Sequence, residues 1–248
     1  MLVGECPRCN YYEKVRNITG IPNTVPLVSS EWGYSTCDAL AEKAVCDGVT
    51  ELRQAKFLAR MTLANIAAGV AAQVWYDYQD DCDNPGNREC RYGVVRQTEP
   101  HQIKPAFLAA QTLKRAVLGK RLSAQLPAPP GAFALRFEDS THALWAWDGP
   151  RLTTCEADVG EREMCGEKGI SEADCAAKNC CFDAATPAEA CFQHPKNTTA
   201  VVEVAAAPGQ CFSVLQWNGT EAAGKACAGP GGGLNVTVSD AVSYLLPT

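Results

Sequence analysis

The sequence has no run of basic side chains and no long apolar stretch. Its formal net charge is -6 at pH 7 over 248 residues. Because nucleic acids and anionic membrane surfaces attract positive patches, this charge argues against both as partners. A transmembrane helix needs about 20 consecutive apolar residues, so the sequence predicts no membrane span.

Histidine is scarce, and His101, His142 and His194 lie far apart in the chain. Their separation suggests neither a catalytic triad nor a metal cluster. A CxxC pair at Cys6 and Cys9 is compatible with redox chemistry or zinc, but no second CxxC or His pair accompanies it. We therefore expect no zinc site.

An acidic stretch also lacks the pattern of a metal site. Asp80, Asp81, Asp83 and Glu89 do not follow the order of ligands, glycine and glutamate that a calcium-binding loop requires. A solvated turn is the favoured interpretation. The sequence thus predicts neither a metal nor another cofactor.

Cysteine, in contrast, is abundant. The 14 cysteines are an even number, which favours disulfides formed in an oxidising compartment. Four glycosylation sequons agree with a secreted or secretory-lumen location, and they begin at Asn17, Asn197, Asn218 and Asn235. The start of the sequence, MLVGEC, has no apolar signal-peptide core, which favours a true N-terminus upstream of Met1.

Hydrophobic periodicity divides the first 120 residues into alternating helices and strands. Their order is that of parallel βα units, but with only two strands. A (β/α)8 barrel normally needs about 250 residues, so residues 1–125 are interpreted as the C-terminal part of a larger barrel. The expected segments are a helix ending in residues 10–17, strands at 25–30 and 70–76, helices at 51–68 and 104–118, and a polar loop at 77–103.

The pattern changes after the stiff run LPAPPG at residues 126–131, which marks a boundary. Apolar residues then alternate with polar ones, as at Phe133, Leu135 and Phe137. We interpret residues 132–248 as an antiparallel β-sandwich with a separate subdomain at 153–196 inserted in it. The overall fold class is therefore α/β plus all-β.

The inserted subdomain is dense in cysteine, with the spacing C-x9-C-x9-C-x4-C-C-x9-C. Below about 40 residues, apolar burial alone rarely holds a fold, so crosslinks must supply the stability. Six cysteines permit fifteen pairings, among which the spacing does not choose. The six are Cys155, Cys165, Cys175, Cys180, Cys181 and Cys191. Cys37 with Cys46, Cys82 with Cys90, and Cys211 with Cys227 are plausible local pairs elsewhere.

This subdomain resembles a trefoil, or P-type, domain. The resemblance rests on Arg162, Cys165-Gly166, Gly169-Ile170, Cys180-Cys181-Phe182-Asp183, Cys191-Phe192 and Pro195. It implies the pairs Cys155 to Cys181, Cys165 to Cys180 and Cys175 to Cys191, and a function that involves carbohydrate. Many trefoils carry a Trp before the last cysteine, where this chain has Ala190, so an aromatic face for a sugar is missing.

The first 120 residues resemble the last quarter of a clan-A glycoside hydrolase barrel. The similarity rests on SSEWGYST, QVWYDYQDD and YGVVRQTEPHQIKPAFLA. It implies that Glu31 is a catalytic nucleophile and that Trp75 is an aromatic platform beneath the sugar. Trp32, Tyr34 and Asp77 are further substrate-binding candidates. The alternatives are a surface carboxylate for Glu31 and a barrel-core side chain for Trp75.

Retaining glycosidases pair a nucleophilic carboxylate with a second one, about 5 to 5.5 Å away, that acts as acid and then base. The clan's second carboxylate follows an Asn, and the sequence contains no Asn-Glu pair. We therefore expect a secreted glycoside hydrolase, here a truncated portion without turnover of its own. The alternatives are a non-catalytic carbohydrate-binding or mucus-associated protein, and a trefoil that serves only as a crosslinked spacer.

Overall fold

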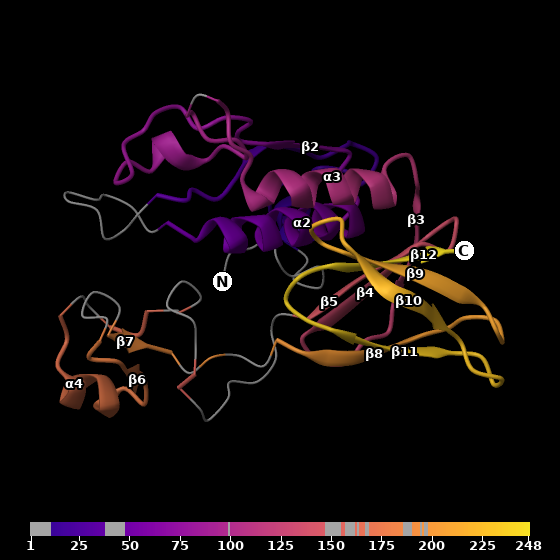
Figure 1. The fold of residues 1–248 in the computed structure, drawn as a ribbon. Helices are drawn as coiled ribbons and strands as arrows, with labels where there is room; N and C mark the ends of the chain where they lie inside the picture. The colour runs from indigo at the N-terminus through magenta and orange to yellow at the C-terminus, as the bar shows by residue number, and fades with distance from the viewer. Residues whose placement is uncertain are drawn as a thin grey trace.

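The computed structural model describes residues 11–37, 48–98, 100–146, 155–156, 162, 164–166, 169–185, 190–193, 195 and 198–248 (Figure 1). Several positions singled out in the sequence lie outside the described residues. They are Cys6, Cys9, Cys46, His194 and Asn197.

The predicted order of helices and strands in the first half is confirmed. This part contains α1 (Tyr11–Thr19), β1 (Val28–Trp32), α2 (Glu51–Ala67), β2 (Ala72–Trp75), the short 3-10 helix η1 (Glu89–Arg91) and α3 (Pro105–Val117). The two long helices match their predicted bounds to within one residue at each end. β1 and β2 pair in parallel, as a βα arrangement requires.

The two long helices begin where their sequences favour a start. The hydroxyl of Thr50 accepts a hydrogen bond from the Arg53 N–H at 3.2 Å and caps α2. Pro105 occupies the first turn of α3, where its missing N–H is not needed. The helices pack side by side through small buried residues, including Ala59 and Ala109.

The first strand begins later than the sequence predicted. β1 starts at Val28, three residues after the expected position. Pro26 has no N–H to donate to a neighbouring strand, which explains the later start. Glu31 therefore lies within the strand, whereas the sequence placed it after the strand.

The second half is built on a six-stranded sheet in the order β10-β9-β12-β5-β4-β3. All its pairs are antiparallel. β3, β5 and β10 were not predicted, since β3 adjoins a proline-rich run and β10 contains small and charged residues. The strands are β3 (Leu122–Leu126), β4 (Ala132–Phe137), β5 (His142–Ala146), β9 (Cys211–Gln216), β10 (Glu221–Cys227) and β12 (Ser243–Pro247).

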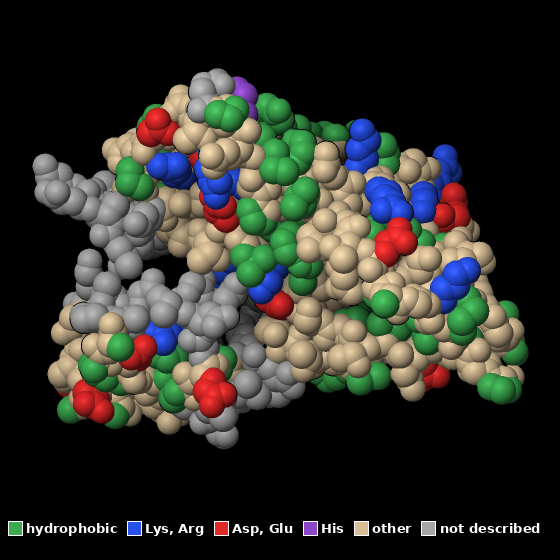
Figure 2. Space-filling model, viewed as in Figure 1, with side chains coloured by type: hydrophobic (Ala, Val, Ile, Leu, Met, Phe, Trp, Pro, Cys, Tyr) green, Lys and Arg blue, Asp and Glu red, His purple; other side chains and the backbone are tan. Residues whose placement is uncertain are grey.

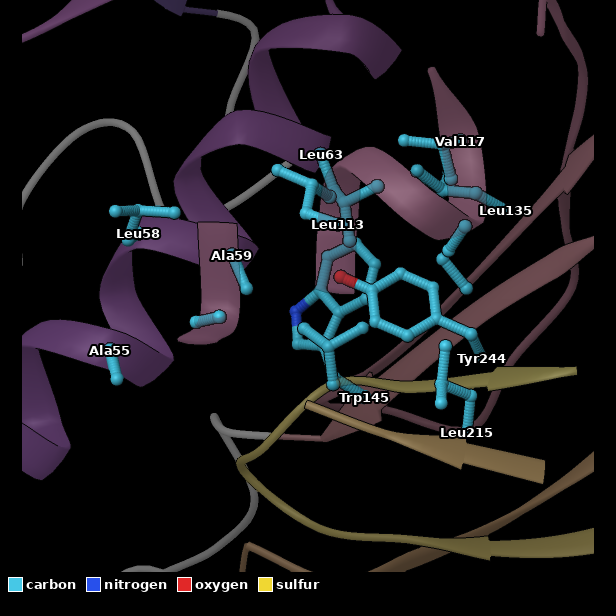
Figure 3. Close-up of a cluster of buried hydrophobic side chains, with 14 of the residues drawn as sticks. Ala55, Leu58, Ala59, Leu63, Leu113, Val117, Leu135, Trp145, Leu215 and Tyr244 are labelled. Atoms are coloured by element: carbon cyan, nitrogen blue, oxygen red, sulfur yellow. The ribbon is translucent and has the colours of Figure 1, made fainter. Parts of the chain in front are cut away.

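The large sheet is covered on both faces. One face packs on α2 and α3 through a core that includes Leu63, Leu113, Leu135, Trp145 and Tyr244 (Figure 3). β4 is almost entirely shielded from solvent because the sheet is covered on both faces. The alternation of apolar and polar residues in its sequence had suggested that one face is exposed to solvent. The helices of the first half and the sheet of the second therefore share one apolar core.

The opposite face of the large sheet carries a second, two-stranded sheet. β8 (Ala200–Val204) and β11 (Leu234–Val238) pair in antiparallel fashion. Val202, Val204, Val236 and Val238 point inward against Leu144 and Leu245. The antiparallel sandwich that the sequence predicted is thus a six-stranded sheet facing a two-stranded one. The residues that face outward on these two strands are polar or exposed.

Between β5 and β8 the chain forms a small lobe with α4 (Glu172–Ala177), β6 (Cys181–Phe182) and β7 (Cys191–Phe192) (Figure 1). Disulfides join Cys155 to Cys181, Cys165 to Cys180 and Cys175 to Cys191, the pairs that the trefoil resemblance implied. Arg162 lies over the ring of Phe192 and forms an ion pair with Asp183 at 2.7 Å.

Disulfides also close two loops outside this lobe. Cys82 pairs with Cys90, and Cys211 pairs with Cys227 across β9 and β10, as their proximity in sequence suggested. Cys37 is disulfide-bonded as well. Within the described residues, every helix is too short or too polar to cross a membrane.

Candidate active site

The parallel pair of β1 and β2 carries the predicted catalytic segment, and its register decides which way each side chain points. Ser29 lies opposite Gln73, and Trp32 lies opposite Trp75. The register shifts between Ser29 and Trp32, which indicates a β-bulge. Because side chains of paired residues share a face of the sheet, the bulge puts Trp32 on the same face as Trp75.

Trp32 and Trp75 face the helices. Their rings meet edge to face with centroids 4.8 Å apart, and both line an open groove between β2 and the two long helices. Trp75 also packs on the core shared by α2, α3 and the large sheet. Of the two interpretations of Trp75 that the sequence left open, the structure therefore favours the barrel-core side chain. Trp32 and Trp75 lie on the face opposite Glu31, and their roles in substrate binding stay predictions.

Glu31 occupies the other face of the pair. The bulge leaves Ser30 and Glu31 between the two helix-facing residues, and the Glu31 side chain is exposed. Val28 and Val74, which also point away from the helices, are 57% and 54% exposed. Parallel sheets are normally buried on both faces, so this face is unusual in carrying exposed apolar residues beside a carboxylate.

Tyr76 is the aromatic residue that sequence reasoning missed. The Tyr76 N–H donates to the carbonyl oxygen of Trp32 at 2.8 Å, which continues the pairing of the strands past Trp75. Since side chains alternate along a strand, Tyr76 points away from the helices, as Glu31 does. Its phenol donates to Asp81 at 3.1 Å, and this contact raises the pKa of Tyr76. The sequence carries a signal for this position: side chains alternate along residues 73–76, QVWY, so Trp75 and Tyr76 are expected to point to opposite faces.

Tyr34 is a core residue. Its side chain is buried, with its ring centroid 4.5 Å from that of Phe57 and 6.3 Å from that of Trp75. Its burial favours a packing role, and a contact of Tyr34 with sugar hydroxyls stays a prediction. The residue follows the close approach of the chain at Gly33, where an added Cβ would lie 2.1 Å from the carbonyl oxygen of Tyr76.

Asp77 lines the groove on the helix side together with Trp75. Burial raises the pKa of Asp77 to about 6, and the nearby carboxylates of Asp81 and Asp80 add to the shift. One of its oxygens, Oδ1, is shielded and has no hydrogen-bond partner among the described residues. The carboxyl group of Asp77 thus titrates near neutral pH.

A buried ion pair fixes the segments that follow β1 and β2. The ammonium of Lys104 donates to Asp80 Oδ1 at 2.6 Å and to the hydroxyl of Thr36 at 2.9 Å. Asp80 Oδ1 also accepts the Gly93 N–H at 2.9 Å. The sequence placed Asp80 in a solvated turn, and that prediction is wrong because the side chain is fully shielded.

Burial shifts the pKa of Asp80 upward and that of Lys104 downward, because each charged form loses its hydration. The contact between the two groups opposes both shifts. Arg91 lies 3.7 Å from the second Asp80 oxygen and adds to the positive side of the network. Three segments distant in sequence are therefore joined at the end of the parallel strands that carries Tyr76.

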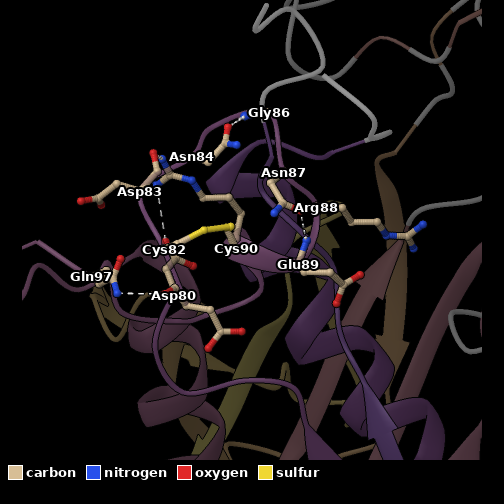
Figure 4. The surroundings of a disulfide bond; sticks show 12 residues. Asp80, Cys82, Asp83, Asn84, Gly86, Asn87, Arg88, Glu89, Cys90 and Gln97 are labelled. Atoms are coloured by element: carbon tan, nitrogen blue, oxygen red, sulfur yellow. Dashed lines mark hydrogen bonds and ion pairs between the residues drawn. A yellow bond between two sulfur atoms is a disulfide. The ribbon is translucent and has the colours of Figure 1, made fainter. Parts of the chain in front are cut away.

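The rest of the acidic stretch forms a tight surface loop closed by the Cys82–Cys90 disulfide (Figure 4). Asn84 accepts the Gly86 N–H, and Asn87 accepts the Glu89 N–H, each at 3.1 Å. These side-chain turns stabilise the loop. Within the described residues, the set with metal-ligand proximity is Cys165, Cys180 and Cys191, and each of these is in a disulfide.

The groove between β2, α2 and α3 has a volume of about 620 Å³. Its walls are mainly apolar, with Leu58, Ile66, Leu113 and Val117 facing β2. Leu118 at its rim is 68% exposed. Figure 2 shows hydrophobic side chains gathered in a band across the face that carries α3. Exposed apolar patches of this kind mark contact surfaces for polypeptide or ligand.

Comparison with known proteins identifies the cysteine-dense lobe. Residues 155–194 match the trefoil (P-type) domain family. This lobe is a trefoil domain. Multiple disulfides and a trefoil domain are typical of secreted or secretory-pathway proteins.

The fold as a whole is similar to that of a family 39 glycoside hydrolase from the gut symbiont Bacteroides cellulosilyticus WH2. The TM-score is 0.60 at 16% sequence identity, and the match covers 96% of this chain and 38% of that chain. The chain thus spans less than two fifths of the length of that hydrolase. No curated protein sequence matches the chain. Outside the trefoil domain, the similarity to this hydrolase is a similarity of fold.

Proposed function

We propose that this chain is the C-terminal part of a retaining clan-A glycoside hydrolase, with Glu31 as the nucleophile. The observation that carries the proposal is the position of Glu31. It is an exposed carboxylate on the face of a parallel strand pair that points away from the helices, in a fold similar to part of a glycoside hydrolase. In a (β/α)8 barrel, that face is the interior and the helices lie outside.

The exposed apolar residues on the same face support this proposal. Val28 and Val74 would be covered by the interior side chains of the strands that complete the barrel. In the proposal the completing strands also supply the acid/base carboxylate. Strand alternation puts Tyr76 on the same face as Glu31, and Tyr76 replaces Trp75 as the proposed platform beneath the sugar.

The proposed chemistry is the two-step displacement of retaining enzymes. The Glu31 carboxylate attacks the anomeric carbon while the acid carboxyl protonates the departing oxygen, which gives a covalent glycosyl-enzyme. Water then releases the sugar with the same anomeric configuration. The buried Asp80–Lys104 pair contributes by holding the ends of β1 and β2 in a fixed relation.

The test uses a longer polypeptide in which this chain is joined to the strands that complete the barrel. Glu31→Gln is expected to remove nearly all turnover while substrate binding remains, because the amide keeps the shape and loses the nucleophile. Glu203→Gln, at an exposed position on β8, is the matched control and is expected to keep full activity. A fluorinated glycoside that traps the intermediate should label Glu31, as read by peptide mass spectrometry. Full turnover by Glu31→Gln would refute the role.

The trefoil domain favours a second candidate, carbohydrate binding without catalysis. Ala190 is buried and precedes Cys191, so the position that carries an aromatic ring in many trefoils offers no stacking face here. A glycan array with the intact chain and with a variant that lacks residues 155–194 separates the candidates. Binding that disappears with the deletion would support the trefoil as the working part. We further propose that the protein is secreted, as its disulfides favour.

A further inference from the structure

Three sequons of the described chain differ in the backbone that presents them. Asn17 lies in α1, Asn235 lies in β11, and Asn218 lies in the turn between β9 and β10. All three side chains are exposed. Exposure therefore does not distinguish the three sequons. Their hydrogen bonds distinguish them.

The turn at Asn218 presents both reactive groups of its sequon to solvent. Asn218 Oδ1 accepts the Thr220 N–H at 3.1 Å, which is an Asx turn. Gly219 has a φ of 86°, a left-handed conformation that glycine adopts without strain. Among the described residues, no partner bonds the amide nitrogen of Asn218 or the hydroxyl of Thr220. The acceptor nitrogen and the hydroxyl that defines the sequon are thus available together.

The other two sequons are more constrained. In α1 the Thr19 hydroxyl donates to the carbonyl oxygen of Val15 at 2.6 Å, so the sequon hydroxyl is engaged and the backbone is helical. In β11 the backbone at Asn235 pairs with Glu203 of β8, within the strand pair. A transferase that must grip an extended segment would have to unfold either element.

We propose that Asn218 is an N-glycosylation site and that Asn17 is not. In the reaction, the Asn218 nitrogen forms a bond to the anomeric carbon of an oligosaccharide donated by a lipid-linked sugar diphosphate. The bond from that carbon to the phosphate oxygen breaks, one proton leaves the amide nitrogen, and the lipid diphosphate departs. No oxidant or reductant is needed.

A glycan at this turn would leave the apolar groove between β2, α2 and α3 uncovered. The hairpin tip lies against α3, where a Cβ added to Gly219 would be 3.2 Å from the Thr112 hydroxyl, and Glu221 pairs with Arg115. Ala110 and Lys114, which line the groove, lie on a different side of α3. The modification is therefore independent of the proposed hydrolase function.

The test expresses the whole chain, fused to a cleavable signal peptide, in a eukaryotic secretory host. The secreted protein is treated with a glycan-removing amidase in water labelled with oxygen-18, which converts each modified Asn to a labelled Asp. Peptide mass spectrometry is expected to find the label at residue 218 and unmodified Asn at 17. An unlabelled residue 218, or a label at residue 17, would overturn the proposal.

Three variants and a control separate the modification from folding effects. Asn218→Gln and Thr220→Ala should each lower the mass of the secreted protein by one glycan, while Thr220→Ser should keep it, because serine retains the hydroxyl. Asn17→Gln is the matched control and should leave the glycan mass unchanged. Glycan mapping needs no enzymatic activity, so failure of the hydrolase proposal would not affect this outcome.

Discussion

The ammonium of Lys104 lies 2.6 Å from a carboxylate oxygen of Asp80, and both side chains are almost completely shielded from solvent. Lys104 is the residue before α3, and Asp80 belongs to the loop that follows β2. This pair therefore connects the beginning of the last helix of the first half with the segment after Tyr76. A buried charge that loses its partner is costly because hydration cannot replace the lost contact.

Lys104→Met should lower the free energy of unfolding by about 3 kcal/mol, because the buried Asp80 carboxylate loses its nearest cation and keeps the more distant Arg91 at 3.7 Å. Chemical denaturation at pH 7 measures the loss. Lys120→Met is the control, since Lys120 pairs with Asp139 near the surface at 2.7 Å and should cost about 0–1 kcal/mol. Equal losses in the two variants would contradict a structural role for the buried pair. The double variant Asp80→Asn with Lys104→Met should recover part of the loss.

Trp75 and Tyr76 should respond differently to truncation. Trp75→Ala should cost about 2–3 kcal/mol of stability, because its half-buried ring packs on the shared core. Tyr76→Ala should cost about 1 kcal/mol, since it loses an exposed hydrogen bond to Asp81 and a ring contact with Tyr92. Thermal and urea unfolding of the chain measure both. If Tyr76→Ala were the more damaging change, the assignment of faces on β2 would be wrong.

His142 should make the protein less stable in acid. Its side chain is 1% exposed, and burial, with Arg136 nearby, holds the pKa of His142 below its usual value. The unfolded chain then takes up the proton first, near pH 6.5, so stability is fully present above that pH and falls as pH decreases below it. The expected slope is about 1.4 kcal/mol per pH unit at most.

Denaturation of the wild-type chain and of His142→Phe between pH 5 and 7.5 checks this slope. The variant should show a smaller dependence over the same range. His101→Phe, at an exposed position, is the control and should keep the wild-type dependence. An unchanged slope in His142→Phe would assign the acid sensitivity to other groups.

Removal of the Cys175–Cys191 disulfide should unfold the trefoil domain alone. Its α4 and two short strands are too small to be held by apolar burial, whereas the large sheet has its own core. Cys175→Ser with Cys191→Ser should give rapid proteolysis within residues 155–194 and an unchanged unfolding midpoint for the rest. The control, Cys211→Ser with Cys227→Ser, should leave the trefoil resistant. A lower midpoint of the main body in the trefoil variant would show that the trefoil supports it.

The sequence predicted the elements that local patterns determine. The 3.6-residue period predicted α2, Pro105 predicted the start of α3, and the resemblance of the cysteine-dense segment to trefoil domains predicted its disulfides. It did not give the direction of Trp75, because that depends on a bulge in β1 and on which face the helices cover. Asp80 was misplaced for a similar reason, since its partner Lys104 lies far along the chain and only the folded loop brings the two together.

The core that α2 and α3 share with the large sheet has a consequence for how the molecule comes apart. The proline-rich run at residues 126–131 looks like a place to divide the chain, but the apolar contacts of Trp145 and Tyr244 continue across it to Leu63 and Leu113. If the chain were divided at this run, each part would expose the apolar surface that it buries against the other part. Helices and large sheet should accordingly melt as one cooperative unit, in a single heat-absorption peak.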